Sequence, residues 1–179
     1  MTRWIRTPEA LHDLVRSFDG CRTIALDTES DSLYHHFEKV CLVQVATDRG
    51  DACLVDSLEV RDLAPLGPVL ADPGVVKVVH GADYDVTTLK RDFGFSFASL
   101  FDTMIAARFL GMPGIGLAAV AEAELGVTLS KTNQKDDWSR RPLTEQQEAY
   151  ALADVEHLVA LREKLEAKLE AKGRLAWVR

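Results

Sequence analysis

The side chains best suited to chemistry in this sequence are acids that follow short apolar runs. Asp27 and Glu29 end the run 24–26 and are separated by one residue. Because side chains alternate between the two faces of a strand, both carboxylates point the same way. Two adjacent carboxylates repel each other, and a divalent cation with oxygen ligands would turn that repulsion into attraction. The alternative is a strand that ends in a solvated acidic turn.

Two further acids favour the metal site. Asp85 follows the run 75–79, which is typical of a central strand covered on both faces. Tyr150 and Asp154 are four residues apart and therefore share one face of a helix. A carboxylate in the apolar stretch 150–155 must be paired, protonated or ligated. Together with the first pair, these acids predict a metal site built from Asp27, Glu29, Asp85 and Asp154.

Such a site is suited to the hydrolysis of phosphodiester bonds. One cation lowers the pKa of a bound water and orients it, while a second, about 4 Å away, stabilises the leaving oxygen. Two divalent cations, Mg²⁺ or Mn²⁺, are therefore the expected cofactors. Tyr150 is suited to positioning the attacking water rather than relaying protons, because an unperturbed phenol titrates near pH 10.

The elements that must position these residues follow an alternating pattern. Strands are expected at residues 23–27, 40–46, 53–55, 75–79 and 100–102. The turn at 48–51 predicts a hairpin, and strands that alternate with helices after a hairpin predict an α/β domain with a mixed sheet. Ligands of open sheets gather beyond the carboxyl ends of strands, where we expect Asp27, Glu29 and Asp85.

One long helix is expected to begin at Thr144, where Gln147 would complete a capping box. Its apolar stripe is expected to face the core and consists of Leu158, Leu161, Leu165 and Leu169. The stripe could also bury against a second copy, so the sequence leaves the oligomeric state open.

The polar segment 128–142 is typical of a functional loop. Lys131, Arg140 and Arg141 could contact phosphates, and Trp138 or Phe37 could stack on a terminal base. The alternatives are solvated basic side chains and an indole that anchors the loop to the core.

Composition limits the class of protein. A chain of 179 residues with 47% hydrophobic and 27% charged residues is typical of one globular domain, residues 1–179. A net charge of -7 argues against a generic nucleic-acid coating protein, but not against an enzyme that holds nucleic acid through metal ions.

Three cysteines without metal-ligand spacing predict buried, reduced thiols. We find no apolar run of the roughly 20 residues that span a bilayer and no signal peptide, so we expect a cytoplasmic protein without membrane contact.

Several motifs together resemble those of a known family. They are Asp27-Thr28-Glu29, His80-Gly81-Ala82-Asp83-Tyr84-Asp85, Phe101-Asp102-Thr103, Tyr150 with Asp154, and the segment 137–143. In this order and spacing they look like the exonuclease motifs of the DEDD superfamily, in particular the tyrosine-containing subclass that includes ribonuclease D. The resemblance covers about residues 23–165.

The resemblance implies a ribonuclease H-like mixed sheet, with its first strands antiparallel and later strands parallel, flanked by helices. It implies that Asp27, Glu29 and Asp154 hold the ion that activates water, and that Asp27 and Asp85 hold the second. Tyr150 would orient the nucleophile. The implied activity is 3′-5′ hydrolysis of single-stranded RNA from its 3′ end.

The same comparison places the second-motif acid at Asp85 rather than Asp83. For His80 it favours a structural role over a ligand role. Leu33, in a loop that could offer apolar surface to a ligand or be an ordinary surface loop, is a further candidate for substrate binding, as are Thr28 and His80. Family members usually carry additional helical nucleic-acid-binding domains, and we expect none within residues 1–179. The same chemistry on DNA, and an inactive nucleic-acid-binding adaptor with this fold, remain alternatives.

Overall fold

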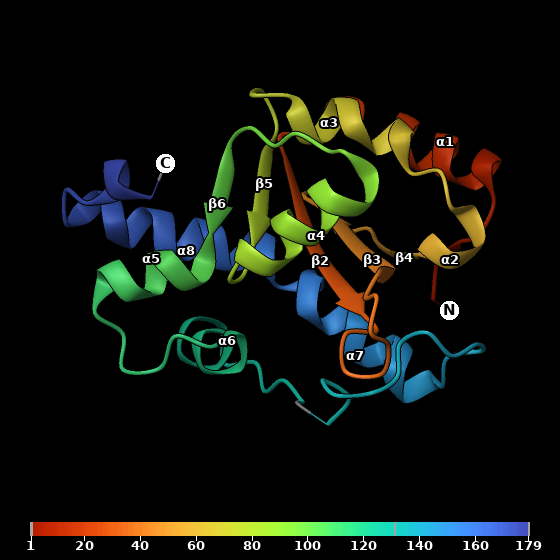
Figure 1. The fold of residues 1–179 in the computed structure, drawn as a ribbon. Helices are drawn as coiled ribbons and strands as arrows, with labels where there is room; N and C mark the ends of the chain where they lie inside the picture. The colour runs from red at the N-terminus through yellow and green to blue at the C-terminus, as the bar shows by residue number, and fades with distance from the viewer. Residues whose placement is uncertain (1, 131, 179) are drawn as a thin grey trace.

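The computed structural model describes residues 2–130 and 132–178, which form a six-stranded sheet with helices on both faces (Figure 1). The strands are β1 (Trp4–Ile5), β2 (Thr23–Ser30), β3 (Val40–Thr47), β4 (Ala52–Val55), β5 (Val76–Val79) and β6 (Leu100–Asp102). Their order across the sheet is β1-β4-β3-β2-β5-β6. β2, β3 and β4 pair antiparallel, whereas β5 and β6 continue from β2 in parallel. The predicted mixed α/β fold is confirmed.

Two layers of helices cover the sheet. The first layer is α1 (Pro8–Ser17), α2 (Ser57–Val60), α3 (Gly67–Ala71) and α4 (Asp83–Phe93), with the 3-10 turn η1 (Ala64–Leu66). The second layer is α5 (Thr103–Leu110), α6 (Leu117–Leu125), α7 (Glu145–Glu156) and α8 (Leu158–Ala171), with η2 (Leu175–Trp177) near the carboxyl end. Side chains that alternate along β2 divide between the layers: Ile24 and Leu26 pack in the first core and Ala25 in the second.

β2 is longer than the sequence pattern predicts. It runs to Ser30, so Asp27 and Glu29 lie within the strand, and the expectation that they lie beyond its end is wrong. The reason is continued pairing with β3, where Glu29 is opposite Leu42 and a register shift follows at Ser30. The acids are therefore held by a central strand of the sheet rather than by a turn.

The predicted long helix is two helices. Thr144 caps α7, and the capping box with Gln147 is present as predicted. The chain bends at His157, and α8 begins at Leu158. The leucine stripe on α8 is buried in the second core, whereas α7 lies across β2, β3 and β4.

Cys21, Cys41 and Cys53 are buried and free, as predicted. Within residues 2–130 and 132–178, we find no helix that is long and apolar enough to cross a membrane.

Candidate metal centre

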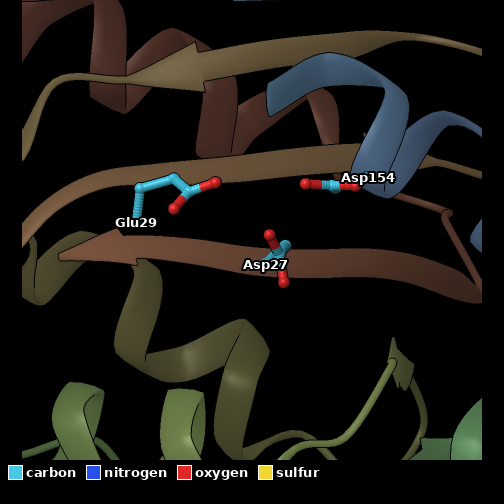
Figure 2. Close-up of side chains that lie close together, drawn as sticks. All are labelled: Asp27, Glu29 and Asp154. Atoms are coloured by element: carbon cyan, nitrogen blue, oxygen red, sulfur yellow. The ribbon is translucent and has the colours of Figure 1, made fainter. Parts of the chain in front are cut away.

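Three carboxylates converge on the face of β2 that α7 covers. Asp27 and Glu29 come from β2 and Asp154 from α7, and their side chains point toward one another in Figure 2. One oxygen from each carboxylate lies within 4.8 Å of the others. Three converging carboxylates supply only oxygen ligands, the donor set that Mg²⁺ and Mn²⁺ prefer. The residues present therefore fit a divalent cation.

Asp85 is the fourth acid of the candidate site. It lies in the first turn of α4, and its carboxylate accepts a hydrogen bond from the Thr28 hydroxyl. A cavity of about 410 Å³ is lined by Asp27, Glu29, Asp85 and Asp154 together with Tyr150. Asp83, the competing acid of the same motif, is exposed. The structure thus gathers the four predicted acids and the tyrosine around one cavity.

Burial and mutual repulsion disfavour the charged forms of these acids. Desolvation, followed by the charges of neighbouring acids, raises the pKa of Asp27 well above its ordinary value and that of Glu29 to about 9. Desolvation is also the largest influence on Asp154 and Asp85, and raises their pKa values to about 7 and about 6. A bound cation would reverse this by giving the ionised carboxylates an opposite charge.

Tyr150 lies one helical turn before Asp154 and interacts with it. A hydrogen bond with the Tyr150 hydroxyl lowers the pKa of Asp154, opposing the effect of burial. Burial, followed by the charges of Asp154 and Glu29, raises the pKa of Tyr150 far above its ordinary value. The phenol therefore keeps its proton at neutral pH and acts as a hydrogen-bond donor.

His80 lines the same cavity as a neutral side chain. The Thr103 hydroxyl donates to the Val79 carbonyl at 3.0 Å, so at 2.9 Å it accepts a hydrogen bond from His80 Nδ1. Burial lowers the pKa of His80, which agrees with an uncharged ring.

Trp138 does not face the cavity. It is 1% exposed and belongs to an apolar cluster with Leu42, Leu54 and Ala151. Its ring centroid lies 6.0 Å from that of Tyr150. Stacking of Trp138 on a base is therefore a wrong prediction, because the indole is enclosed by the core. It anchors the loop and packs beside Tyr150.

Arg141 is also used internally. Its guanidinium donates to the Asp56 carboxylate at 2.6 and 2.9 Å and to the Cys41 carbonyl at 2.8 Å. Its Nη1 donates to the Trp138 and Arg140 carbonyls at 2.8 and 2.7 Å. The predicted phosphate contact of Arg141 is wrong, because these partners together occupy its donors. Arg140 pairs with Asp137 at 3.0 Å but leaves 82% of its side chain exposed. Lys131 lies outside the described residues.

The loop between β2 and β3 presents apolar side chains to solvent. Leu33 is 67% and Phe37 is 87% exposed. The Tyr34 hydroxyl donates to the Lys135 carbonyl at 2.7 Å, which ties this loop to the segment 128–142. The described residues that line the cavity include Thr28 but not Leu33 or Phe37.

Sequence reasoning missed part of the cavity wall. The cavity is also lined by Met104, by the start of α6 at Gly116–Ala118, and by Leu129, Ser130 and Gln134. The glycine-rich break at 111–116, just before α6, is a signal that could have indicated this side of the site.

The fold and the site define a class of protein: an α/β domain whose central strand and covering helix form a carboxylate cluster that could hold a metal ion. A family model described as 3′-5′ exonuclease matches residues 2–170. Ribonuclease D of Escherichia coli (strain K12) is 37% identical over 170 residues, which cover 94% of this chain and 45% of that protein. The exosome complex exonuclease RRP6 of Saccharomyces cerevisiae is 36% identical over 176 residues, which cover 98% of this chain and 24% of that protein.

Solved structures agree with these relatives. The crystal structure of Escherichia coli RNase D, an exoribonuclease, matches with a TM-score of 0.92 and 35% identity, over 99% of this chain and 48% of that chain. NrnC of Brucella melitensis bound to pGG matches with a TM-score of 0.84 and 28% identity, over 99% of this chain and 86% of that chain. The chain spans between 19% and 46% of the length of the curated relatives it matches. This chain belongs to the 3′-5′ exonuclease family, and its resemblance to ribonuclease D is confirmed.

The metal-free protein should lose stability as the pH rises. Glu29 has an ordinary pKa of 4.5 and a folded-state pKa of about 9, so the folded state binds the proton more tightly than the unfolded state. Stability from protonated Glu29 is therefore present below pH 4.5 and lost as the pH rises toward 9. Urea unfolding across this range, in chelator, should show a shallower decline for Glu29→Gln than for the parent. Equal slopes would contradict this electrostatic account.

Asp27→Asn should stabilise the metal-free protein and remove its response to metal. Because the change removes one member of the repelling cluster, the free energy of unfolding at pH 8 should rise by about 1–2 kcal/mol. Mg²⁺ or Mn²⁺ should raise the melting temperature of the parent but not of this variant. Asp83→Asn, an exposed acid on the same turn as Asp85, is the control and should keep the metal response. If the melting temperature of Asp27→Asn still rose with Mg²⁺ or Mn²⁺, Asp27 would be excluded as a ligand.

Proposed function

We propose that this chain is a metal-dependent 3′-5′ exonuclease that hydrolyses single-stranded RNA from its 3′ end with two divalent cations. The observation that carries the proposal is the convergence of Asp27, Glu29 and Asp154 in a cavity beside Tyr150, in a chain of the 3′-5′ exonuclease family. Acids from a strand and from two helices supply the ligands that this chemistry requires.

In this proposal Asp27, Glu29 and Asp154 hold one cation, and Asp85 with Asp27 holds the other. The cations, when bound, supply an activated water and charge stabilisation for the leaving oxygen. The protonated Tyr150 hydroxyl holds Asp154 and orients the attacking water by hydrogen bonding. Thr28, which lies between Asp27 and Glu29 on β2, holds Asp85 of α4 in place by donating a hydrogen bond to its carboxylate.

RNA is the favoured substrate because the relatives include ribonuclease D and an exosome exonuclease. On the surface, Leu33 and Phe37 are exposed enough to stack on bases, and Arg140 is exposed enough to contact a phosphate. A cytoplasmic location is part of the proposal, since free buried thiols suit a reducing compartment. A second candidate is a very short substrate, since NrnC was solved bound to pGG.

A direct assay tests the activity. The parent protein should shorten 5′-labelled single-stranded RNA from its 3′ end with Mg²⁺ or Mn²⁺ and should stop in chelator. Asp27→Ala should reduce cleavage by several orders of magnitude, because it removes a ligand of both cations, whereas Asp83→Ala should cleave as the parent does.

Parallel reactions with DNA of the same sequence and with pGG identify the substrate. Faster cleavage of DNA would transfer the proposal to DNA, and turnover of pGG alone would establish the short-substrate candidate. No metal-dependent shortening of any of them would exclude the enzyme and leave the inactive adaptor.

Phe37→Ala should weaken the binding of RNA without slowing the chemical step. Stacking on an aromatic ring contributes about 1–3 kcal/mol per base, so KM should rise at least about fivefold while kcat changes little. Trp177→Ala removes another exposed aromatic side chain, on η2, and should leave KM unchanged. A KM for Phe37→Ala equal to that of the parent would show that this ring does not hold the substrate.

A further inference from the structure

Gln44 on β3 is a fully buried amide without a visible role. Its side chain is 0% exposed. Both Nε2 and Oε1 lack a hydrogen-bond partner within the part of the chain that the structure describes. Leaving such a group unpaired costs about 1–3 kcal/mol, so a buried unpaired amide requires an explanation.

The strand register places Gln44 beside the metal centre. It lies directly opposite Asp27 on β2 and opposite Leu54 on β4. Directly opposite residues of an antiparallel pair share a face, with Cβ atoms about 4.5–5.5 Å apart. On β3 itself, the neighbours on the same face are Leu42 and Ala46. Of these four neighbours, only Asp27 carries a polar side chain.

The unpaired atoms of Gln44 show what kind of partner is needed. A hydrogen-bond donor could satisfy Oε1 but not Nε2. Nε2 carries two N–H donors and requires an acceptor. A carboxylate that binds a cation keeps lone pairs for further hydrogen bonds, and such bonds fix the orientation of a metal ligand. Asp27 is therefore the partner that both chemistry and register favour.

We propose that Gln44 is a positioning residue for the metal centre: its Nε2 donates a hydrogen bond to the carboxylate of Asp27 when cations are bound. The inference rests on the metal site of the proposed function. Gln44 is fully buried and is not among the described residues that line the cavity, so it acts through Asp27 and not on the nucleic acid.

Gln44→Met tests the proposal, because methionine has a similar length and removes only the amide. Folding stability should stay the same or rise, since an unpaired buried group is lost. The affinity of the metal-free protein for Mn²⁺, measured by calorimetry or electron paramagnetic resonance, should fall about 10- to 100-fold. In the RNA assay at one fixed Mn²⁺ concentration, both kcat and kcat/KM for RNA should fall, because fewer molecules hold both cations.

Leu42→Met is the matched control. Leu42 is 0% exposed, lies on the same face of β3 and is opposite Glu29, so the change disturbs packing behind a metal ligand without removing an amide. It should keep the Mn²⁺ affinity of the parent. An equal loss of affinity in both variants would assign the effect to packing and overturn the proposal.

The other outcomes are equally distinct. A folded Gln44→Met protein with the Mn²⁺ affinity and kcat of the parent overturns this inference and leaves the proposed function standing. A parent protein that neither binds Mn²⁺ nor cleaves any substrate overturns the proposed function itself.

If the methionine variant does not fold, the side-chain amide of Gln44 can be observed in the parent by nuclear magnetic resonance. Titration with Mg²⁺ should move its proton signals downfield and slow their exchange. Unchanged signals in a protein that binds Mg²⁺ would contradict the proposal.

Discussion

The repulsion among partly buried carboxylates is the constraint on which the rest of this structure depends. Asp27, Glu29 and Asp154 are held within 4.8 Å of one another, in surroundings that raise their pKa values. Such a cluster persists only if rigid elements hold it. β2 is paired on both sides, by β3 and β5, and α7 lies across it. Packing of the sheet and helices thus maintains an arrangement that the charges alone would disperse, and cations would relieve the repulsion.

The residues around α7 serve that same purpose. Trp138 is enclosed by the core beside Tyr150, and Arg141 is paired with Asp56 at the end of β4. Both fix the segment that leads into the helix carrying Tyr150 and Asp154. Trp138 and Arg141 have the chemical character of nucleic-acid contacts but position the site instead, so in the proposed function surface contact would come from exposed side chains such as Phe37 and Arg140.

Local periodicity explains what could be predicted from the sequence. The two-residue spacing of Asp27 and Glu29, and the four-residue spacing of Tyr150 and Asp154, determine which side chains share a face in any strand or helix. The length of β2, the bend at His157 and the burial of Trp138 depend on tertiary partners that are distant in sequence. The pairing of Arg141 with Asp56, for example, joins residues 85 positions apart. Local sequence patterns cannot predict contacts between residues so far apart in the chain.

Charge balance links the metal centre to the binding of nucleic acid. The chain has a net charge of -7, and its cavity is lined by four acids, so the bare site offers a phosphate no positive charge. Arg141 cannot offset this, because its charge is already paired with Asp56. None of the described residues that line the cavity is a lysine or an arginine, so bound cations would supply positive charge for a phosphodiester there. In the proposed function, cations that carry out the chemistry would also recruit the substrate, so an acidic protein could act on a polyanion.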